Sequence, residues 1–357
     1  MDMKLIDAMP GARNCAVTLA GVTRGENVFI LTDSNSDPRI AQALAAACRE
    51  AGAAVTVSFM ESRSIPHEEP PKPVAAAMKA SDVFFEICEP MILYSAACRE
   101  AKDAGARHIV CAMENIKGLC SEGARWPLEI TFEVCRRVFH QWRNGKTIHI
   151  TAENGTDLVS ELRPEYVVGG PMRSVEPGTF EVFAGGTGDV GVWPAWTAEG
   201  VLVFDCLHTF VGLLDRKVKV TVEKGRVVNV EGGAAQVKFL EEVREKYGED
   251  AWHLGELMIG LCPKARVLTD DPSHLEAHRH AGCLHAAMGM SIDFYEDPTD
   301  RKTLKMTPSV DPGIHLDHLV IEPTITIDGE PCVEKGRLLA LDDPDIQALA
   351  RKLGVEA

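Results

Sequence analysis

The sequence lacks the features that mark several large classes of protein. No apolar run reaches the ~18 residues of a membrane-spanning helix, and the N-terminal "MDMKLIDAMPGARNC" has no apolar signal core. The eleven cysteines form no C-x-x-C pair, which argues against a structural zinc site. We therefore expect a cytoplasmic protein whose cysteines are reduced thiols.

Basic charge is also scarce. The chain has 37 lysines and arginines against 53 aspartates and glutamates, a net charge of −16 that is spread along its length. Nucleic acids and anionic membranes are bound by basic faces, so neither is expected as a partner. A small molecule is the expected substrate.

Strand and helix patterns alternate through the first 160 residues. "NVFILTD" (27–33) is a β-branched run, "DPRIAQALAAACREAG" (37–52) has helical spacing between a proline and a glycine, and "AAVTVSFM" (53–60) is strand-like. The first turn, "TDSNSDPR", contains no glycine to cradle a nucleotide phosphate. Such alternation implies parallel strands with crossover helices. We predict an α/β N-terminal domain with a parallel sheet over residues 1–160.

Glycine becomes frequent after "RPEYVVGGPMRSVEPGT" (163–179), and strand patterns then dominate. "TFEVFAGG", "GVLVFDC" and "KVKVTVEKGRVVNVEGG" are predicted strands, the last a hairpin, with one helix expected over 235–248. We predict a strand-rich α+β metal-binding domain over residues 161–357.

Histidines gather in this second region. Seven of the twelve lie between residues 253 and 318: His253, His274, His278, His280, His285, His315 and His318. In "GIHLDHLV" (313–320), His315 and Asp317 are two residues apart and would share one face of a strand, whereas His318 would face the other way. An imidazole beside a carboxylate suits a divalent metal.

Further donors lie upstream of this pair. Glu256 sits in the apolar "HLGELMIGLCP", where a buried carboxylate needs a partner. His285 sits in "AGCLHAAMGM", which would equally suit a core histidine, and Asp189 lies in the glycine-rich "GGTGDVGVWP". Glu276 is an alternative ligand.

Carboxylate and imidazole donors without a thiolate suit Zn, Mn, Co or Fe(II) at a catalytic site. The candidate ligands exceed what one metal with an open position uses, which favours two ions. They are Asp189, Glu256, His285, His315 and Asp317.

Four segments of the chain carry a resemblance to a known family: "LGELMIGLCP", "GCLHAAMG", "HLD" and "TITIDGEPCVEKGRL". They resemble the aminopeptidase T metallopeptidase family and its relatives around 2,5-dihydroxypyridine 5,6-dioxygenase. The resemblance spans most of the chain and implies a two-domain metalloenzyme that forms homo-oligomers. The peptidases bind two divalent metals. Their ligand pattern falls, residue by residue, on Asp189, Glu256, His285, His315 and Asp317. Ile292 stands where the peptidases have a tyrosine, and Tyr295 follows three residues later.

The dioxygenase branch binds one Fe(II) through two histidines and an aspartate. His315 and Asp317 match its H-x-D, and Glu256 stands in place of its other histidine. The candidate ligands match the ligand pattern of the peptidases better than that of the dioxygenases. We therefore predict a metal-dependent hydrolase that cleaves an amide-type bond of a small peptide or of a cyclic or aromatic amide by metal-activated water. The alternatives are a ring-cleaving Fe(II) dioxygenase of a hydroxylated N-heterocycle and a binding protein without catalysis.

In the hydrolase, Glu256 would bridge the metals or act as general base, and Tyr295 or His280 would assist the developing oxyanion. Trp193 and Trp196, close to Asp189, could wall an aromatic substrate. Ordinary packing at a turn is the alternative for the two tryptophans.

Overall fold

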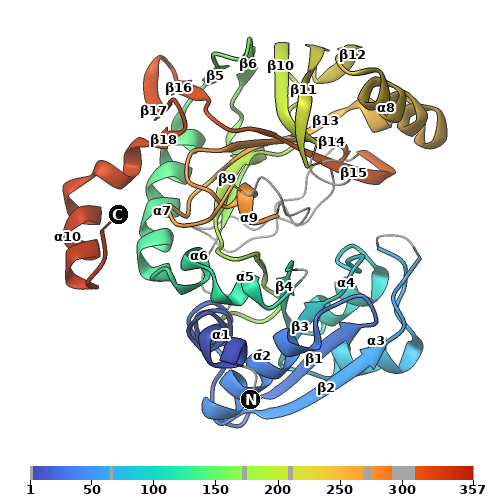
Figure 1. Ribbon diagram of the computed structural model, residues 1–357, viewed down its shortest axis with the longest axis vertical. Helices are drawn as coiled ribbons and strands as arrows, with labels where there is room; N and C mark the ends of the chain where they lie inside the picture. The colour runs from blue at the N-terminus through green and yellow to red at the C-terminus, as the bar shows by residue number, and fades with distance from the viewer. Residues whose placement is uncertain are drawn as a thin grey trace. The chain divides into compact units, whose positions relative to one another are not determined.

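The computed structural model describes residues 3–64, 67–113, 115–170, 175–207, 212–267, 275–291 and 310–356 (Figure 1). Contacts divide the chain into two compact units, Met1–Phe132 with Pro171–Thr187 and Glu133–Gly170 with Gly188–Ala357. The chain passes between these units three times. The strand and helix patterns of the sequence, in contrast, predict a single domain boundary near residue 160.

The first unit is built on a parallel sheet, as predicted. In the described part of the chain its strand order is β2-β1-β3-β4-β8, and every pairing is parallel. The strands are β1 (Asn27–Asp33), β2 (Ala54–Met60), β3 (Val83–Ile87), β4 (Arg107–Cys111) and β8 (Phe180–Phe183). The helices are α1 (Met3–Arg13), α2 (Pro38–Glu50), α3 (Lys72–Lys79), α4 (Ala96–Asp103), α5 (Lys117–Cys120) and α6 (Glu122–Arg125).

Strand β1 explains why this sheet has helices on both faces. Its residues from Val28 onward are all buried, which fits its continuous apolar sequence. Val28 and Ile30 pack into a core with residues of α1 and α2. Phe29 and Leu31, which point the other way, pack into a core with residues of α3 and α4. Both faces of the sheet are therefore covered.

Strand β8 corrects the sequence prediction, which placed "TFEVFAGG" in the second domain. It pairs in parallel with β4, with Phe180 opposite His108 and Phe183 opposite Cys111. The local pattern identifies a strand correctly, but the partner lies some seventy residues earlier in the chain. Local alternation carries no information about such a distant partner.

The second unit is built on an antiparallel sheet, which confirms the strand-rich prediction. Over the described residues the order is β18-β17-β16-β5-β6-β10-β15-β14-β13-β9-β7, with β11 on β10 and β12 on β11. Its first strands are β5 (Thr147–Thr151), β6 (Asp157–Glu161), β7 (Val167–Gly170), β9 (Asp189–Val192), β10 (Glu199–Leu207), β11 (Gly212–Glu223) and β12 (Arg226–Glu231). The later ones are β13 (Leu254–Gly260), β14 (Leu284–Ser291), β15 (Val310–Val320), β16 (Thr324–Ile327), β17 (Glu330–Glu334) and β18 (Arg337–Leu338).

Helices accompany this sheet. They are α7 (Leu128–Asn144), which begins before the division between the units, α8 (Ala234–Tyr247), α9 (Leu275–His278) and α10 (Pro344–Lys352). Helix α8 confirms the prediction over 235–248, and β11 with β12 confirms the hairpin. No helix in the described ranges is long and apolar enough to cross a membrane.

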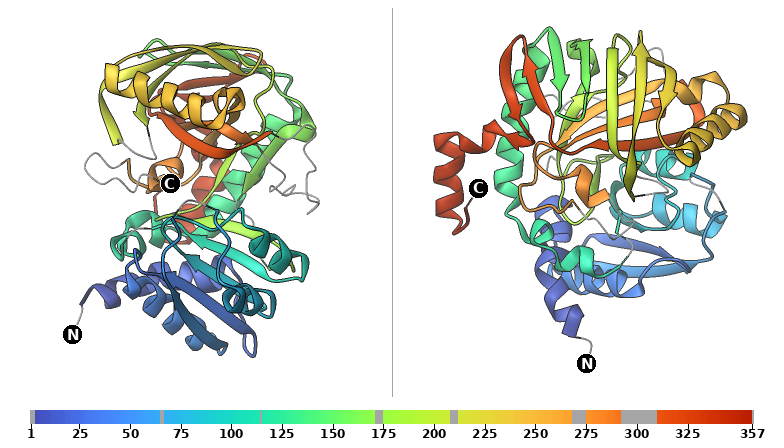
Figure 2. Two further views of the ribbon diagram at one scale, coloured as in Figure 1. Left: turned by 90° about the vertical axis from the view of Figure 1, so that its right-hand side faces the viewer. Right: turned by 45° about the horizontal axis from the view of Figure 1, so that its top comes forward.

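Strands from distant parts of the chain lie side by side in the second unit (Figure 2). Strand β10 pairs with β15, and β5 pairs with β16. Strands β9, β13, β14 and β15 follow one another in the sheet and carry the predicted metal ligands. The sheet order therefore brings together residues that are far apart in the sequence.

Candidate metal centre

Three neighbouring strands present metal donors on one face of the sheet. Glu256 in β13 lies opposite Ala287 in β14, which lies opposite Asp317 in β15. His285 lies opposite Met258, two residues after Glu256. Residues opposite each other in antiparallel strands share a face, as do residues two apart in one strand. Glu256, His285, His315 and Asp317 therefore point the same way.

Three of these side chains converge on one point. Nε2 of His315 lies 3.2 Å from Oδ1 of Asp317 and 3.8 Å from Oε1 of Glu256. One donor atom from each of the three lies within 4.8 Å of the other two. This spacing suits a single ion. The H-x-D motif and the buried glutamate thus form one cluster.

His285 lies beside this cluster rather than within it. Its Nε2 is 3.2 Å from Oε1 of Glu256, and the side chain is buried. Its ring stacks on that of His278, with centroids 4.6 Å apart. His285 therefore orients the Glu256 carboxylate in this arrangement.

The electrostatics of the cluster call for a cation. Burial raises the pKa of Glu256, against the lowering effect of its hydrogen bond to His285 and of His315. Oε2 of Glu256 is buried and, among the described residues, has no hydrogen-bond partner. Burial lowers the pKa of His315, but Asp317 and Glu256 outweigh it and raise the value to about 9. A divalent cation would use the orphaned oxygen and offset both carboxylates, so the residues fit a metal.

The ring of His315 is held from behind. Its Nδ1 donates to the Met290 carbonyl oxygen at 3.1 Å, and the ring stacks on Trp193 with centroids 5.4 Å apart. A ligand histidine is commonly fixed by such a hydrogen bond from its other nitrogen. The bond leaves Nε2 facing the cluster, where a bound ion would take the place of its proton. Trp193 therefore contacts a predicted ligand, and it is almost fully buried.

Asp189 shares the sheet face but does not join the cluster. It lies opposite Gly260 in β13, and its carboxylate forms an ion pair with Arg279. Both partners are buried. The structure thus offers Asp189 a cation from the protein itself, and its role as a metal ligand stays a prediction. Glu276, the alternative ligand, is paired with Arg266, with Nη2 and Oε2 2.6 Å apart.

Trp196 and His280, two further predicted residues, are not among the three converging donors and make other contacts. Trp196 packs against His253, with ring centroids 4.8 Å apart. Nδ1 of His280 donates to the Ala265 carbonyl oxygen at 2.7 Å. Tyr295 lies outside the described residues. A G-x-G-x-x-G spacing, typical of dinucleotide-binding loops, occurs at 186–191. It leads into strand β9 rather than a helix, so the structural context of such a loop is absent there.

His253 gives a prediction about acid stability. Burial, and then the charge of Arg226, lowers its pKa from 6.5 to about 4. The unfolded chain therefore takes up this proton first, and the stability linked to neutral His253 is lost as the pH falls from about 6.5 to about 4. The free energy of unfolding of the wild type is expected to fall between about pH 7 and pH 5. In the His253→Gln variant we expect this fall to be smaller by up to about 2 kcal/mol.

The measurement is urea unfolding followed by tryptophan fluorescence. Trp142, Trp193, Trp196 and Trp252 report on the second unit, and Trp126 on the first. Comparing the two pH values within each protein removes the constant cost of the substitution. Equal pH dependence in wild type and variant would contradict the assignment.

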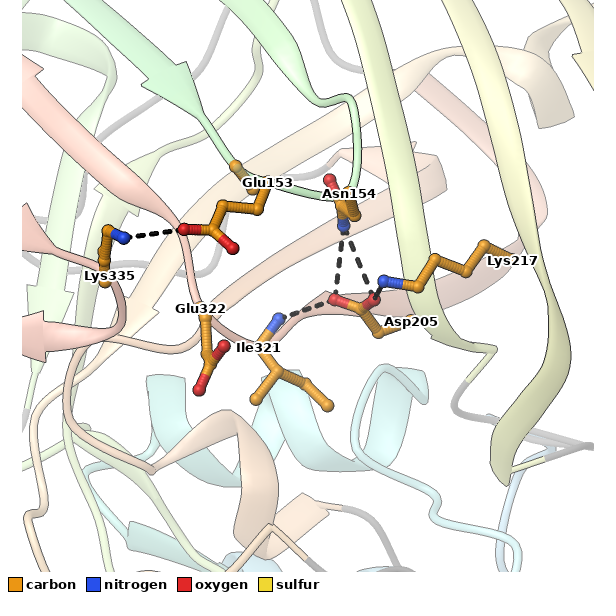
Figure 3. A pocket seen from close by; sticks show the side chains of 8 residues that line it. Glu153, Asn154, Asp205, Lys217, Ile321, Glu322 and Lys335 are labelled. Carbon is orange, nitrogen blue, oxygen red and sulfur yellow. Dashed lines mark hydrogen bonds and ion pairs between the residues drawn. The ribbon is translucent and has the colours of Figure 1, made fainter.

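A polar hollow of about 620 Å³ lies in the second unit and is lined by other residues than the metal cluster (Figure 3). Asp205 accepts hydrogen bonds there from Asn154 and from the Ile321 amide, and it pairs with Lys217. Glu153, which also lines the hollow, pairs with Lys335. These carboxylates already have protein cations, so they suit a metal less well than Glu256 and Asp317 beside His315.

Comparisons with known proteins agree with a metalloenzyme. The family model described as 2,5-dihydroxypyridine 5,6-dioxygenase matches residues 9–340. The structure of a 2,5-dihydroxypyridine dioxygenase from Pseudomonas putida is similar, with a TM-score of 0.73 and 18% identity over 92% of this chain and 96% of that one. AmpT from Thermus thermophilus is similar too, with a TM-score of 0.65 and 14% identity over 94% of this chain and 99% of that one. No curated protein sequence matches the chain significantly.

Proposed function

Because the chain belongs to the 2,5-dihydroxypyridine 5,6-dioxygenase family, we propose that it opens the ring of a hydroxylated, nitrogen-containing aromatic molecule with O2. The observation that carries the proposal is the match to this family over residues 9–340, combined with a cluster sized for one ion. The sequence alone favours an amide hydrolase and keeps the dioxygenase as the alternative. The family match reverses that order.

Glu256, His315 and Asp317 would hold one Fe(II). When bound, Fe(II) supplies the one-electron chemistry that O2 needs in order to react with a closed-shell ring. The set differs from the usual two histidines and one carboxylate of such iron sites, because Glu256 replaces an imidazole. Two carboxylates offset the charge of a divalent ion in full, whereas one carboxylate would leave a positive charge.

The surrounding residues keep these donors in place. Met290 fixes which nitrogen of His315 carries the proton, and Trp193 limits rotation of the ring. His285 holds Oε1 of Glu256, which also lies 3.8 Å from Nε2 of His315, and Oε2 has no hydrogen-bond partner among the described residues. Trp193 also packs with Val168 and Met258 in an apolar group that keeps water from this side of the site. Pre-set donors of this kind reduce the reorganisation needed during the reaction.

A metal-dependent hydrolase is the second candidate. Its supporting observation is the donor set itself, since two carboxylates and an imidazole also suit an ion that activates water. Glu256, held by His285, is then placed to accept a proton. The fold similarity to AmpT is compatible with this candidate but, at 14% identity, concerns the fold alone.

The test is oxygen uptake by protein stripped of metal and reloaded anaerobically with Fe(II) or with Zn(II). With 2,5-dihydroxypyridine as the probe, we expect O2 consumption and loss of the ring absorbance with Fe(II) only. The same two preparations are assayed against a panel of dipeptides and aromatic amides. Amide cleavage with Zn(II), and no O2 uptake with Fe(II), would replace the dioxygenase by the hydrolase.

A further inference from the structure

We propose that the first unit contains a structural Zn(II) site formed by Glu86, Cys98 and His108. The proposal is independent of the function proposed for the second unit. Glu86 lies in β3, Cys98 in α4 and His108 in β4. One donor atom from each lies within 4.8 Å of the other two, and all three residues are fully buried.

The fold brings these donors to one side of the parallel sheet. Phe84 in β3 lies opposite His108 in β4, and Glu86 is two residues after Phe84, so Glu86 and His108 share a face. Phe84 and Cys98 belong to the same hydrophobic core, which helices α3 and α4 cover. The three donors thus come from two strands and from the helix that packs over them.

The contacts of this cluster leave it incompletely satisfied. Oε2 of Glu86 lies 2.9 Å from Nε2 of His108, and Oε1 accepts from the Ile92 amide at 2.6 Å. The Cys98 thiol donates to the Ile92 carbonyl oxygen at 3.4 Å. Nδ1 of His108, also buried, has no hydrogen-bond partner within the described part of the chain. The ring of His108 stacks on Phe84 at 4.1 Å, so the surroundings are apolar.

Charge balance favours an ion at this point. Among the described residues, no lysine or arginine pairs with the Glu86 carboxyl group, whose contacts are with His108 and the Ile92 amide. A carboxylate in an apolar core is costly without a counter-charge. A divalent ion would displace the thiol proton, and Zn²⁺ with one carboxylate and one thiolate is electrically neutral.

The donor types indicate which ion and which role. A thiolate, an imidazole and a carboxylate are all zinc ligands. The Ile92 carbonyl oxygen accepts from the Ser95 amide at 2.8 Å and from the Cys98 thiol, and only the second of these bonds would be lost when the thiol is deprotonated. Full burial leaves no open position for substrate, so the role is structural. The ion would join β3, β4 and α4 and so stabilise the first unit.

The test uses the full chain carrying His315→Ala and Asp317→Ala, which disables the cluster in the second unit. Co(II) is the probe, because a thiolate ligand gives it a charge-transfer absorption band in the near ultraviolet. We expect about one Co(II) per chain with this band. Adding Cys98→Ala should abolish the band, while Cys88→Ala should leave it unchanged. Cys88 is a matched control, since it is buried in the same hydrophobic core but is not one of the three donors.

Thermal unfolding provides the second measurement. Zn(II) at about a hundred times its Kd should raise the unfolding midpoint of the His315→Ala, Asp317→Ala chain by about 5–10 °C, and should not do so after His108→Gln. If Glu86 and His108 only share a proton, no Co(II) will bind and Zn(II) will not shift the midpoint. That result, or a band that survives Cys98→Ala, would overturn the proposal.

Discussion

Replacing His315 by alanine is expected to remove the metal of the second unit and to lower turnover by at least about a thousandfold, equivalent to roughly 4 kcal/mol. The reason is that His315 is the imidazole of the three-donor cluster, and the two carboxylates that remain, Glu256 and Asp317, would repel each other without it. The measurement is iron per chain after anaerobic reconstitution, together with O2 uptake. Asp317→Ala should behave in the same way.

His318→Gln is the matched control. His318 lies three residues along the same strand but points to the other face, where its ring lies 4.4 Å from that of Phe204. This variant should keep its metal, and any loss of activity should follow its loss of stability. Equal metal content in the His315→Ala and His318→Gln proteins would show that the cluster is not the metal site.

Replacing Arg279 by methionine is expected to lower the free energy of unfolding by about 3–5 kcal/mol. The substitution leaves the buried carboxylate of Asp189 without its cation. The measurement is urea unfolding followed by tryptophan fluorescence. The double variant Asp189→Asn, Arg279→Met should recover much of the loss, because it leaves no unpaired charge behind.

Arg163→Met provides the control for this prediction. Arg163 pairs with Glu161 at a site where both side chains are at least half exposed, so the variant should change stability by less than about 1 kcal/mol. If Arg279→Met costs no more than Arg163→Met, the buried ion pair does not have the importance assigned to it. If Arg279→Met binds a second metal ion, Asp189 is the ligand that the sequence predicts.

The first unit is largely predictable from the sequence because its strands and helices are local patterns. The strand over 27–33 is continuously apolar because it is buried on both faces of the sheet. The helix from Pro38 to Glu50 begins where the side chain of Asp37 caps it. Strand β8 is placed in the wrong sheet, because its partner is set by the path of the chain. No local pattern records that path.

The metal cluster is predictable for a similar reason. Alternation along a strand places His315 and Asp317 on one face, and an isolated carboxylate in an apolar run marks Glu256. The pairing of Asp189 with Arg279 is not predictable, because it depends on a turn that brings Arg279 against Gly260.

The donors of the first unit are missed because each stands alone in its segment. Glu86 is the one signal that could have revealed them. It is a charged residue inside the buried run "VFFEI". Such a residue requires a partner for the same reason as Glu256. Its partners, His108 and Cys98, belong to other segments and are found only in the fold.

The source of the oxygen atoms in the product tests the central claim most directly. The Fe(II)-loaded protein is given 2,5-dihydroxypyridine under ¹⁸O2 in ordinary water, and the product is analysed at once by mass spectrometry. The account predicts that both new oxygen atoms are labelled and that one O2 is consumed for each ring opened. Product that carries oxygen from water alone, formed without O2 uptake, would contradict it and identify the protein as a hydrolase.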